Sequence, residues 1–299
     1  MTSFPYASNR LELGSSVFEW GNRTYVMGII NVTPDSFSGD GLVASAGPVE
    51  AAVALAQAQV AAGADLLDVG GESTRPGSQP VPLDEELRRV IPVVAALREA
   101  VGVPISIDTY KAEVARQALA AGASLVNDVW ALRMDPAMAE VVAAAGAPVV
   151  LMHNRSRPKD ADQSARLGGR YVGIEYTDLL ADIQRELSES IALAQQAGVA
   201  LDRIIVDPGI GFGKTVEQNL ELVDRLDELR SLGYPILVGP SRKSFVGYTL
   251  NLPPEQRVEG TAAAVALAID RGADVVRVHD VAAMVRVARI ADAISRRSP

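Results

Sequence analysis

The chain of 299 residues contains no cysteine, only two histidines and few aromatic residues (5%). The absence of cysteine excludes disulfide bridges and thiolate metal sites. Two histidines cannot form a three-histidine metal site, and no His-Glu-x-x-His pattern occurs. Any metal ion would therefore be a hard cation held by oxygen ligands, such as Mg²⁺ shared with substrate phosphates. The low aromatic content favours layered aliphatic packing over an all-β sandwich.

The chain also lacks an excess of basic residues and a long apolar segment. Its formal net charge of −9 argues against a general nucleic-acid or anionic-membrane surface, because both partners require a basic face. No apolar segment approaches the ~20 residues needed to span a bilayer. The start, MTSFPYASNRLELG, has neither the basic segment nor the apolar core of a signal peptide. We therefore expect a cytoplasmic protein with neither a nucleic-acid nor a membrane partner.

Short β-branched segments alternate with alanine-rich amphipathic segments along most of the chain. The former predict eight strands, at residues 25–31, 66–71, 104–108, 124–129, 148–153, 203–207, 235–239 and 275–280. Several are almost continuously apolar, which is typical of parallel strands covered on their outer face. Helical patterns such as VEAAVALAQAQVAAGA and VEQNLELVDRLDELRSLG lie between them.

This alternation indicates the α/β fold class. Eight strands and about eight helices, with no long linker, predict a single (β/α)8 TIM-barrel domain over residues 1–299. The alternative, an open Rossmann-like sheet, would need a glycine-rich turn after the first strand, where IINVTPDSF stands. At the amino end, LELGSSVFEW, a turn at Gly21-Asn22 and RTYVMG predict a short hairpin over about residues 10–26.

Polar residues end nearly every predicted strand or follow it directly. In a barrel, the carboxyl ends of the strands and the loops after them build the active site. Helix caps explain single cases such as Asp128 and Asp280, but they do not easily explain eight strand ends at once. We therefore expect a site at these ends, which include Asn31, Asp68, Asp108, Asn127, His153, Asp207, Arg277 and His279.

The residue types at these ends suggest a ligand with a ring at one end and a phosphate at the other. Acceptors and an amide donor that can read an amino-substituted heterocycle are supplied by Asp108, Asn127 and Asp207. Positive charge suited to a phosphate or pyrophosphate comes from Arg75, Lys243, Arg277 and His279. Because Arg277 and His279 alternate along one strand, we expect both side chains on the same face.

The segment DPGIGFGKT resembles a nucleotide-binding loop, but Pro208 stands where the first glycine is required. We interpret its glycines as allowing the backbone to approach a flat ligand, with Phe212 as an apolar wall. Lys214 is expected to be solvated at the start of the next helix. His153 stands alone in LMHN, and a hydrogen-bonded structural role is expected for it.

The ordered motifs of this chain resemble those of the dihydropteroate synthase family. They are MGIINVTPDSFSGDG, GADLLDVGGESTRPG, ISIDT, NDV, LMH, DPGIGFGK, SRKSF and RVHDV, and they span residues 27 to 281. The resemblance implies a TIM-barrel enzyme of folate biosynthesis, with dimers common in the family. Such an enzyme joins 6-hydroxymethyl-7,8-dihydropterin pyrophosphate to p-aminobenzoate and releases 7,8-dihydropteroate and pyrophosphate.

The resemblance also implies roles for residues at matching positions. Those implied to bind the pterin are Asp108, Asn127, Asp207 and Lys243, with Met152 lining its pocket. Mg²⁺ and pyrophosphate would be held by Asn31, with Arg277 and His279 joining it on the pyrophosphate. Two loops would cover the site, the first around Asp35 and the second with Thr74 and Arg75. The p-aminobenzoate site would be bordered by Ser244, Pro76, Gly211 and Phe212.

Catalysis in such an enzyme consists mainly of positioning and electrostatic stabilisation. Mg²⁺ and three side chains would stabilise charge on the leaving pyrophosphate, namely Arg75, Arg277 and His279. Asp35 would favour the cationic pterin, and Lys243 would act from the pterin side. Ser244, at a helix N-terminus, would receive the carboxylate of p-aminobenzoate, and Arg242 would support the loop.

Three stretches depart from the usual family pattern. The first loop reads SFSGDG where SFSDGG is more common, and Pro240 replaces a small or apolar residue before the serine of SRKS. Residues 154–169 lack a methionine-rich continuation of LMH and predict a flexible polar loop.

Two other functions remain open at this point. A pterin-dependent methyltransferase domain shares the barrel and the pterin-reading residues, but it needs no pyrophosphate site. A catalytically silent paralogue would bind pterin or a partner protein without turnover.

Overall fold

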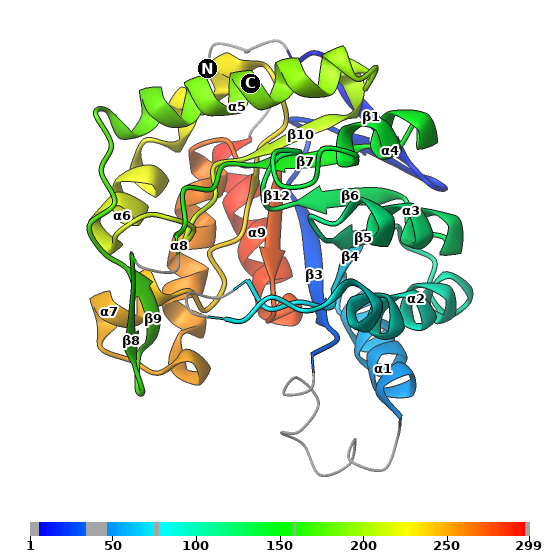
Figure 1. Ribbon diagram of the computed structural model, residues 1–299. Coiled ribbons are helices and arrows are strands. Elements are labelled where there is room, and N and C mark those ends of the chain that lie inside the picture. The colour runs from blue at the N-terminus through cyan, green and yellow to red at the C-terminus, as the bar shows by residue number, and fades with distance from the viewer. Residues whose placement is uncertain (1–5, 34–46, 75–77, 158–159, 297–299) are drawn as a thin grey trace.

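The computed structural model, which describes residues 6–33, 47–74, 78–157 and 160–296, contains a closed barrel of parallel strands (Figure 1). The strands are β3 (Tyr25–Asn31), β4 (Leu66–Gly70), β5 (Ile105–Asp108), β6 (Leu125–Asp128), β7 (Val149–Met152), β10 (Ile204–Asp207), β11 (Leu237–Val238) and β12 (Val275–Val278). Their order is β10-β7-β6-β5-β4-β3-β12-β11. A parallel bridge between Val206 and Ile236 joins the two ends of this order and closes the barrel. The predicted (β/α)8 architecture is confirmed.

Helices surround the strands on the outside (Figure 1). They are α1 (Pro48–Ala61), α2 (Leu83–Ala100), α3 (Ala112–Ala121), α4 (Met138–Ala145), α5 (Leu179–Gln196), α6 (Val216–Asp224), α7 (Ser244–Leu250), α8 (Val258–Asp270) and α9 (Val281–Ser295). Local sequence sets several of the starts. Thr215 and Gln218 form a capping box at α6, and Asp178 accepts a hydrogen bond from Ala181 N at α5. Among the helices of the described ranges, none is both long and apolar enough to cross a membrane.

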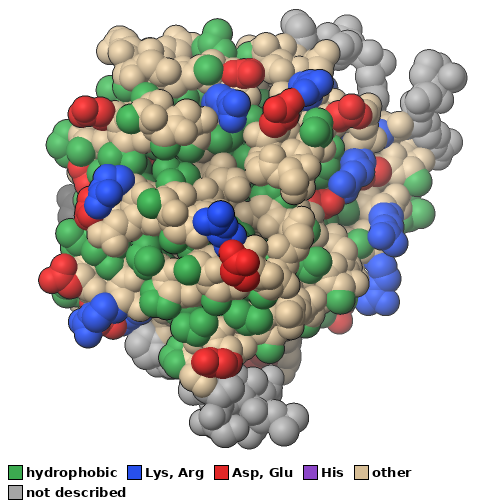
Figure 2. Space-filling model, turned by 90° about the vertical axis from the view of Figure 1, so that its right-hand side faces the viewer, with side chains coloured by type: hydrophobic (Ala, Val, Ile, Leu, Met, Phe, Trp, Pro, Cys, Tyr) green, Lys and Arg blue, Asp and Glu red, His purple; other side chains and the backbone are tan. Residues whose placement is uncertain are grey.

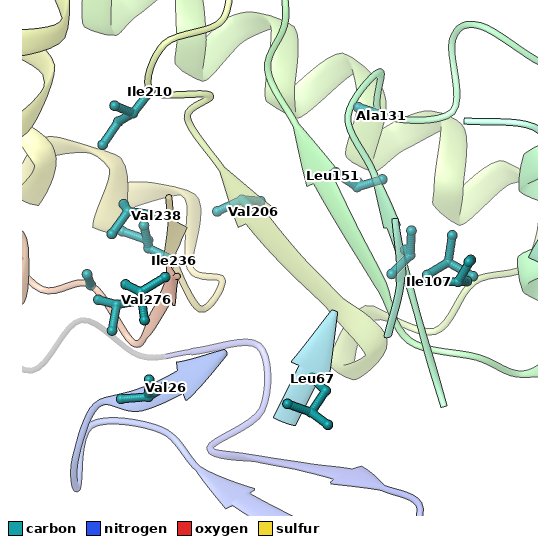
Figure 3. Packing of buried hydrophobic residues seen from close by; sticks show 14 of the residues in the cluster. Val26, Leu67, Ile107, Ala131, Leu151, Val206, Ile210, Ile236, Val238 and Val276 are labelled. Carbon is teal, nitrogen blue, oxygen red and sulfur yellow. The ribbon is translucent and has the colours of Figure 1, made fainter. Parts of the chain in front are cut away.

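The core has two layers that follow the alternation of side chains along each strand. Outward-facing residues such as Val26, Leu67 and Ile107 pack against the helices, and Figure 3 shows part of this cluster. Their sequence neighbours face the barrel interior and form a second cluster, which includes Tyr25 and Leu66. Strands buried on both faces explain the almost continuously apolar segments in the sequence.

The amino-terminal hairpin covers the amino ends of the barrel strands. It consists of β1 (Arg10–Leu13) and β2 (Ser16–Glu19), which pair antiparallel. Leu11, Leu13, Phe18 and Trp20 are buried and belong to the cluster of the barrel interior. Apolar residues thus fill the end of the barrel opposite the polar strand ends.

The predicted hairpin turn was wrong in position. The turn lies at Gly14-Ser15, where Gly14 has φ +55°, and not at Gly21-Asn22. The segment that starts at Tyr25 pairs with β12 and β4 inside the barrel and is therefore not a hairpin strand. The hairpin accordingly spans residues 10–19.

The prediction of a flexible polar loop after β7 was also wrong. Most of it belongs to an antiparallel hairpin of β8 (Ala161–Ser164) and β9 (Gly168–Tyr171), which lies beside α7 (Figure 1). The Arg170 guanidinium lies 4.4 Å from the centre of the Tyr248 ring, and Arg257 donates a hydrogen bond of 2.9 Å to Leu167 O. These contacts with a distant part of the chain order a polar segment that has little apolar signal of its own.

One side of the molecule carries charges of both signs, interspersed among apolar and neutral groups (Figure 2). Ion pairs between residues one helical turn apart occur on α2 and α3, for example Arg88 with Glu85 and Arg116 with Glu113. Such exposed pairs contribute at most about 1 kcal/mol each to stability.

Candidate active site

Polar side chains from four strands meet at the carboxyl end of the barrel. The Arg277 guanidinium on β12 donates from Nε to Asp68 Oδ2 at 2.5 Å and from a terminal nitrogen to Asp108 Oδ2 at 2.7 Å. Asn127 Nδ2 donates to the same Asp68 oxygen at 3.0 Å. The predicted convergence of Asp108, Asn127 and Arg277 is therefore found in the structure.

Asp68 lies at the centre of this network, although it was predicted only as one of the strand-end residues, with no specific role. It is fully buried, and one carboxylate oxygen accepts both from Arg277 and from Asn127. The signal was a carboxylate inside the otherwise apolar segment LLDVG, because an acidic residue is almost never fully buried without a partner.

Burial raises the pKa of Asp108, and the neighbouring Asp68 carboxylate acts in the same direction against the opposing Arg277 charge. Burial disfavours the charge on Arg277, but Asp68 and Asp108 outweigh it and raise the pKa of the guanidinium. A positive charge is thus held between two carboxylates at the mouth of the barrel.

A second group of predicted residues gathers beside β10. Asp207 Oδ1 accepts from Gly209 N at 2.7 Å, and burial raises the pKa of this carboxyl while Lys243 opposes the shift. Lys243 Nζ donates to Ile210 O and lies 4.5 Å from the centre of the Phe212 ring. Burial lowers the pKa of Lys243 to about 8, although Asp207 favours its charge. Asp207, Phe212 and Lys243 therefore share one side of the site.

The Arg277 and His279 side chains are half-buried, whereas Val278 between them is fully buried, as their alternation predicts. Ser241 orients His279, because its Oγ lies 3.0 Å from His279 Nδ1 and also accepts from the His279 backbone N at 3.1 Å. Sequence reasoning did not single out Ser241, since the pairing joins residues from two different strand ends.

Arg242 supports the loop after β11, as expected. Its Nε donates to Asp280 Oδ2 at 2.9 Å, its terminal nitrogen contacts the other oxygen, and its backbone N donates to Thr261 Oγ1 at 3.0 Å. The helix-cap explanation of Asp280 was wrong, because this carboxylate binds Arg242 and caps no backbone N–H of α9.

The helix-cap explanation of Asp128 was also wrong. Its carboxylate accepts from Trp130 N and Leu132 N, both at 2.8 Å, and so closes the turn after β6. The next helix, α4, begins only at Met138. Burial raises the pKa of Asp128 to about 6, while the two backbone hydrogen bonds oppose the shift.

The glycines of DPGIGFG approach the protein's own chain, which corrects the interpretation that they make room for a flat ligand. A Cβ on Gly209 (φ +72°) would lie 1.9 Å from His153 O. A Cβ on Gly213 (φ +59°) would lie 2.5 Å from Ser156 N. Both positions therefore require glycine for positive φ and for contact with the loop after β7.

Lys214 is buried, and the prediction of a solvated side chain was wrong. Its Nζ contacts Gly209 O, Phe212 O and His153 Nδ1 at 3.0, 3.1 and 3.0 Å. The glycine-rich segment folds over this side chain, a tertiary effect that local sequence does not reveal. His153 is also buried and has the expected structural role.

The remaining predicted residues stand at the carboxyl end of the barrel or next to it. Asn31 ends β3, Met152 ends β7, Thr74 follows β4, and Ser244 is the first residue of α7. The predictions for Asp35, Arg75 and Pro76 concern residues outside the described ranges. In the ranges that the structure describes, no group of three or more acidic residues or histidines is placed to hold a metal ion.

Comparisons with known proteins agree with one another. A sequence profile described as pterin binding enzyme matches residues 27–279. The dihydropteroate synthase of Synechocystis sp. is 48% identical over 287 residues, which cover 96% of this chain and 95% of that protein. A crystal structure of the dihydropteroate synthase from Clostridium difficile in the presence of pteroic acid has a TM-score of 0.84, with 48% identity over 94% of this chain and 100% of the other. The Xanthomonas albilineans enzyme with 4-aminobenzoic acid has a TM-score of 0.86, with 46% identity over 98% and 100%.

Proposed function

Since the chain belongs to the dihydropteroate synthase family of pterin-binding enzymes, we propose that its strand ends divide the reaction among three neighbouring subsites. The reaction joins 6-hydroxymethyl-7,8-dihydropterin pyrophosphate to p-aminobenzoate and gives 7,8-dihydropteroate and pyrophosphate. The near full-length match to synthases decides against the methyltransferase alternative. The main observation behind this division is the position of the Arg277 guanidinium. It binds the carboxylates of Asp68 on β4 and Asp108 on β5, and it lies on the same strand as His279.

The pterin subsite consists of the buried polar groups on one side of the mouth. Asp108, Asn127 and Asp207 offer carboxylate and amide groups to the amino and ring nitrogens of a pterin. Lys243 stands next to Asp207, and Met152 at the end of β7 is buried. A buried carboxylate with a raised pKa forms a stronger hydrogen bond than an exposed one, because little water competes with the ligand.

The pyrophosphate subsite uses Arg277 and His279, and Arg75 is expected to contribute from its position in the sequence motif. Arg277 binds an anion by a planar fork of donors. In the structure it faces two carboxylates, so an arriving pyrophosphate competes with them for the guanidinium. Charge that develops on the leaving oxygen is stabilised by these donors.

The residues present fit a Mg²⁺ ion that is bound mainly by substrate. Asn31 offers one amide oxygen at the end of β3, and the described residues contain no cage of carboxylates or histidines for a permanent ion. Mg²⁺ typically takes one or two protein ligands together with substrate phosphates and water. When bound, it would neutralise negative charge on the departing pyrophosphate.

The p-aminobenzoate subsite lies beside the glycine-rich segment. Phe212 forms an apolar wall, and Ser244 at the start of α7 offers a hydroxyl and backbone N–H groups to the carboxylate. The aniline nitrogen attacks the exocyclic methylene carbon as the bond from that carbon to the pyrophosphate oxygen breaks.

We also propose a homodimer, in which a second copy covers apolar side chains of α8 and α9. The Leu267, Ile290 and Ile294 side chains are 55%, 60% and 58% exposed, and the two helices pack against each other. Sedimentation of the wild type and of Ile290→Glu tests this. If the proposed interface is correct, the wild type is a dimer and the variant is a monomer.

The cytoplasmic location and the absence of nucleic-acid and membrane partners stay predictions from composition.

The test of the function is a product assay. The protein is incubated with the pterin pyrophosphate, p-aminobenzoate and Mg²⁺, and both pyrophosphate and dihydropteroate are measured. We expect equal amounts of the two products. Tight pterin binding without either product at high protein concentration would contradict the proposed function and indicate a silent paralogue.

A further inference from the structure

Lys214 is a buried cation to which the proposed reaction assigns no role. It directly follows the glycine-rich segment 208–213, and its Nζ lies 3.0 Å from Gly209 O, 3.1 Å from Phe212 O and 3.0 Å from His153 Nδ1. An ammonium group has three protons and no acceptor. These three contacts therefore occupy all its donors.

A line of polar groups runs from Lys214 away from the site. Because an ammonium group only donates, His153 Nδ1 must accept, and the ring proton then stands on Nε2. Nε2 faces Glu186 Oε2 at 3.1 Å, an ion-pair distance without good hydrogen-bond alignment. Burial and the charge on Lys214 lower the pKa of His153 to about 3, so the ring is neutral. Arg155 Nε donates to the other Glu186 oxygen at 2.9 Å.

The glycine-rich segment is held by side chains along most of its length. Besides the two carbonyls bound by Lys214, there are contacts of Ile210 O with Lys243, Gly211 N with Asn219 Oδ1 (2.6 Å) and Gly213 O with the Tyr176 hydroxyl (2.8 Å). Lys214 differs from these partners because it binds the segment at two points, on either side of Gly211. Lys214 therefore joins the two ends of the stretch from Gly209 to Phe212, in addition to the contacts that Lys243 and Asn219 make within it.

We propose that Lys214 is a positioning residue for p-aminobenzoate. As an ammonium group that binds Gly209 O and Phe212 O, it holds the segment in the shape that places Phe212 against this substrate. The inference rests on the proposed function, because that function gives Phe212 its role. His153 acts through Lys214 by accepting its third hydrogen bond, and Glu186 acts through it by favouring its charge.

The proposal makes substrate binding depend on the protonation of Lys214. A neutral amine has two protons for three acceptors, so one contact is lost. Burial lowers the pKa of Lys214 to about 7. Asp207 on β10 and Glu186 on α5 raise it, whereas Lys243 after β11 and Arg155 after β7 lower it. The side chain is thus charged below about pH 7, and positioning weakens as pH rises through that value.

The experiment measures kcat and the KM of each substrate from about pH 6 to about pH 9, at saturating Mg²⁺ and second substrate. p-Aminobenzoate does not change its charge in this range, because its carboxyl stays ionised and its aniline nitrogen neutral. The variants are Lys214→Met, which removes the charge, and Glu186→Gln, which keeps the contacts of Lys214 but removes an anion that favours its charge. Glu189→Gln on the same helix is the matched control, because Glu189 is 62% exposed and pairs only with Arg185 in the described residues.

We expect the wild-type KM for p-aminobenzoate to rise about tenfold as pH increases through 7, the effect of losing one hydrogen bond to a charged group. Lys214→Met should show the high KM already at low pH, with kcat and the KM for the pterin pyrophosphate changed less than about threefold. In Glu186→Gln, the increase of the KM for p-aminobenzoate should occur at a lower pH than in the wild type. Glu189→Gln should match the wild type. Lys243, with a pKa of about 8, also titrates in this range and is coupled to Lys214. Glu186→Gln keeps both lysines, so a shift of the KM increase in that variant reports on Lys214.

Three results would overturn the inference. The KM of Lys214→Met could equal that of the wild type at low pH, or both KM values and kcat could change together, as in a general loss of structure. If Lys214→Met does not fold, the test rests on Glu186→Gln. An increase of its KM for p-aminobenzoate at the same pH as in the wild type would refute the proposal. A wild-type protein that forms no dihydropteroate would instead overturn the proposed function, and the inference with it.

Discussion

Arg277→Met is expected to destabilise the protein strongly, because it leaves two buried carboxylates without their cation. Methionine keeps an unbranched side chain but removes the guanidinium, which contacts Asp68 at 2.5 Å and Asp108 at 2.7 Å. Removing one partner of a buried ion pair costs about 3–5 kcal/mol. Asp108 can limit its share by taking up a proton, because burial already raises its pKa. Most of the loss should therefore come from the fully buried Asp68.

Urea unfolding followed by tryptophan fluorescence measures this loss as a shift of the midpoint. Arg271→Met is the matched control, since Arg271 is 40% exposed and its ion pair with Asp224 should contribute less than about 1 kcal/mol. The double variant Asp68→Asn/Arg277→Met should lose at least about 1 kcal/mol less stability than the two single variants added together, because it no longer has an unpaired buried charge. Additive losses, or a loss no larger than that of Arg271→Met, would refute the assignment of a coupled buried pair.

The loss should also depend on pH in a defined direction. A carboxyl whose pKa is raised on folding favours the folded state most at low pH, and this contribution is lost as pH rises through the folded pKa. Burial raises the pKa of Asp108 in this way, and without Arg277 the opposing charge disappears. The deficit of Arg277→Met relative to the wild type should therefore be smaller at about pH 5 than at about pH 8. A deficit that grows on acidification would contradict this reasoning.

Three further outcomes are expected. Gly209→Ala should lower the free energy of unfolding by about 3 kcal/mol or more, because the new Cβ would clash with His153 O. Gly146→Ala, which has a similar φ but open space around it, should lose about 1–2 kcal/mol in the same urea assay. Equal losses would show that only φ matters. Ser241→Ala should lower kcat/KM for the pterin pyrophosphate about tenfold by releasing His279, with an unchanged KM for p-aminobenzoate. Chelation of Mg²⁺ should abolish product formation but leave the binding of a pterin without pyrophosphate intact in calorimetry, and activity in the chelator would count against a role for the ion.

The barrel could be predicted because its signal repeats along the chain. Eight apolar segments with helical patterns between them appear in the sequence, and parallel strands covered on both faces require them. The β8–β9 hairpin could not be predicted in this way. Its segment is polar, and it is ordered by contacts with Tyr248 and Arg257, which follow it by more than 70 residues. The turn at Gly14-Ser15 was missed because Gly21-Asn22 carries an equally good local turn signal.

Much of the candidate site could also be predicted, since barrel geometry brings strand ends together wherever they stand in the chain. Asp108, Asn127 and Arg277 meet for this reason. Asp280 was misassigned because a helix cap is the usual explanation of an acidic residue before a helix, and its actual partner, Arg242, lies 38 residues away.

The order of strands, helices and strand-end polar residues was determined by the sequence alone, because periodicity and strand ends are local properties of a chain. Burial of a particular charge is not local. Lys214 and Asp68 become buried only when other segments fold over them, and their partners, His153 and Arg277, lie 61 and 209 residues away. The charge state and orientation of these groups depend on that enclosure, because desolvation and a specific partner set them together. For this reason the end of the barrel where the polar residues gather could be predicted from the sequence, whereas the pairing of their charges required the tertiary structure.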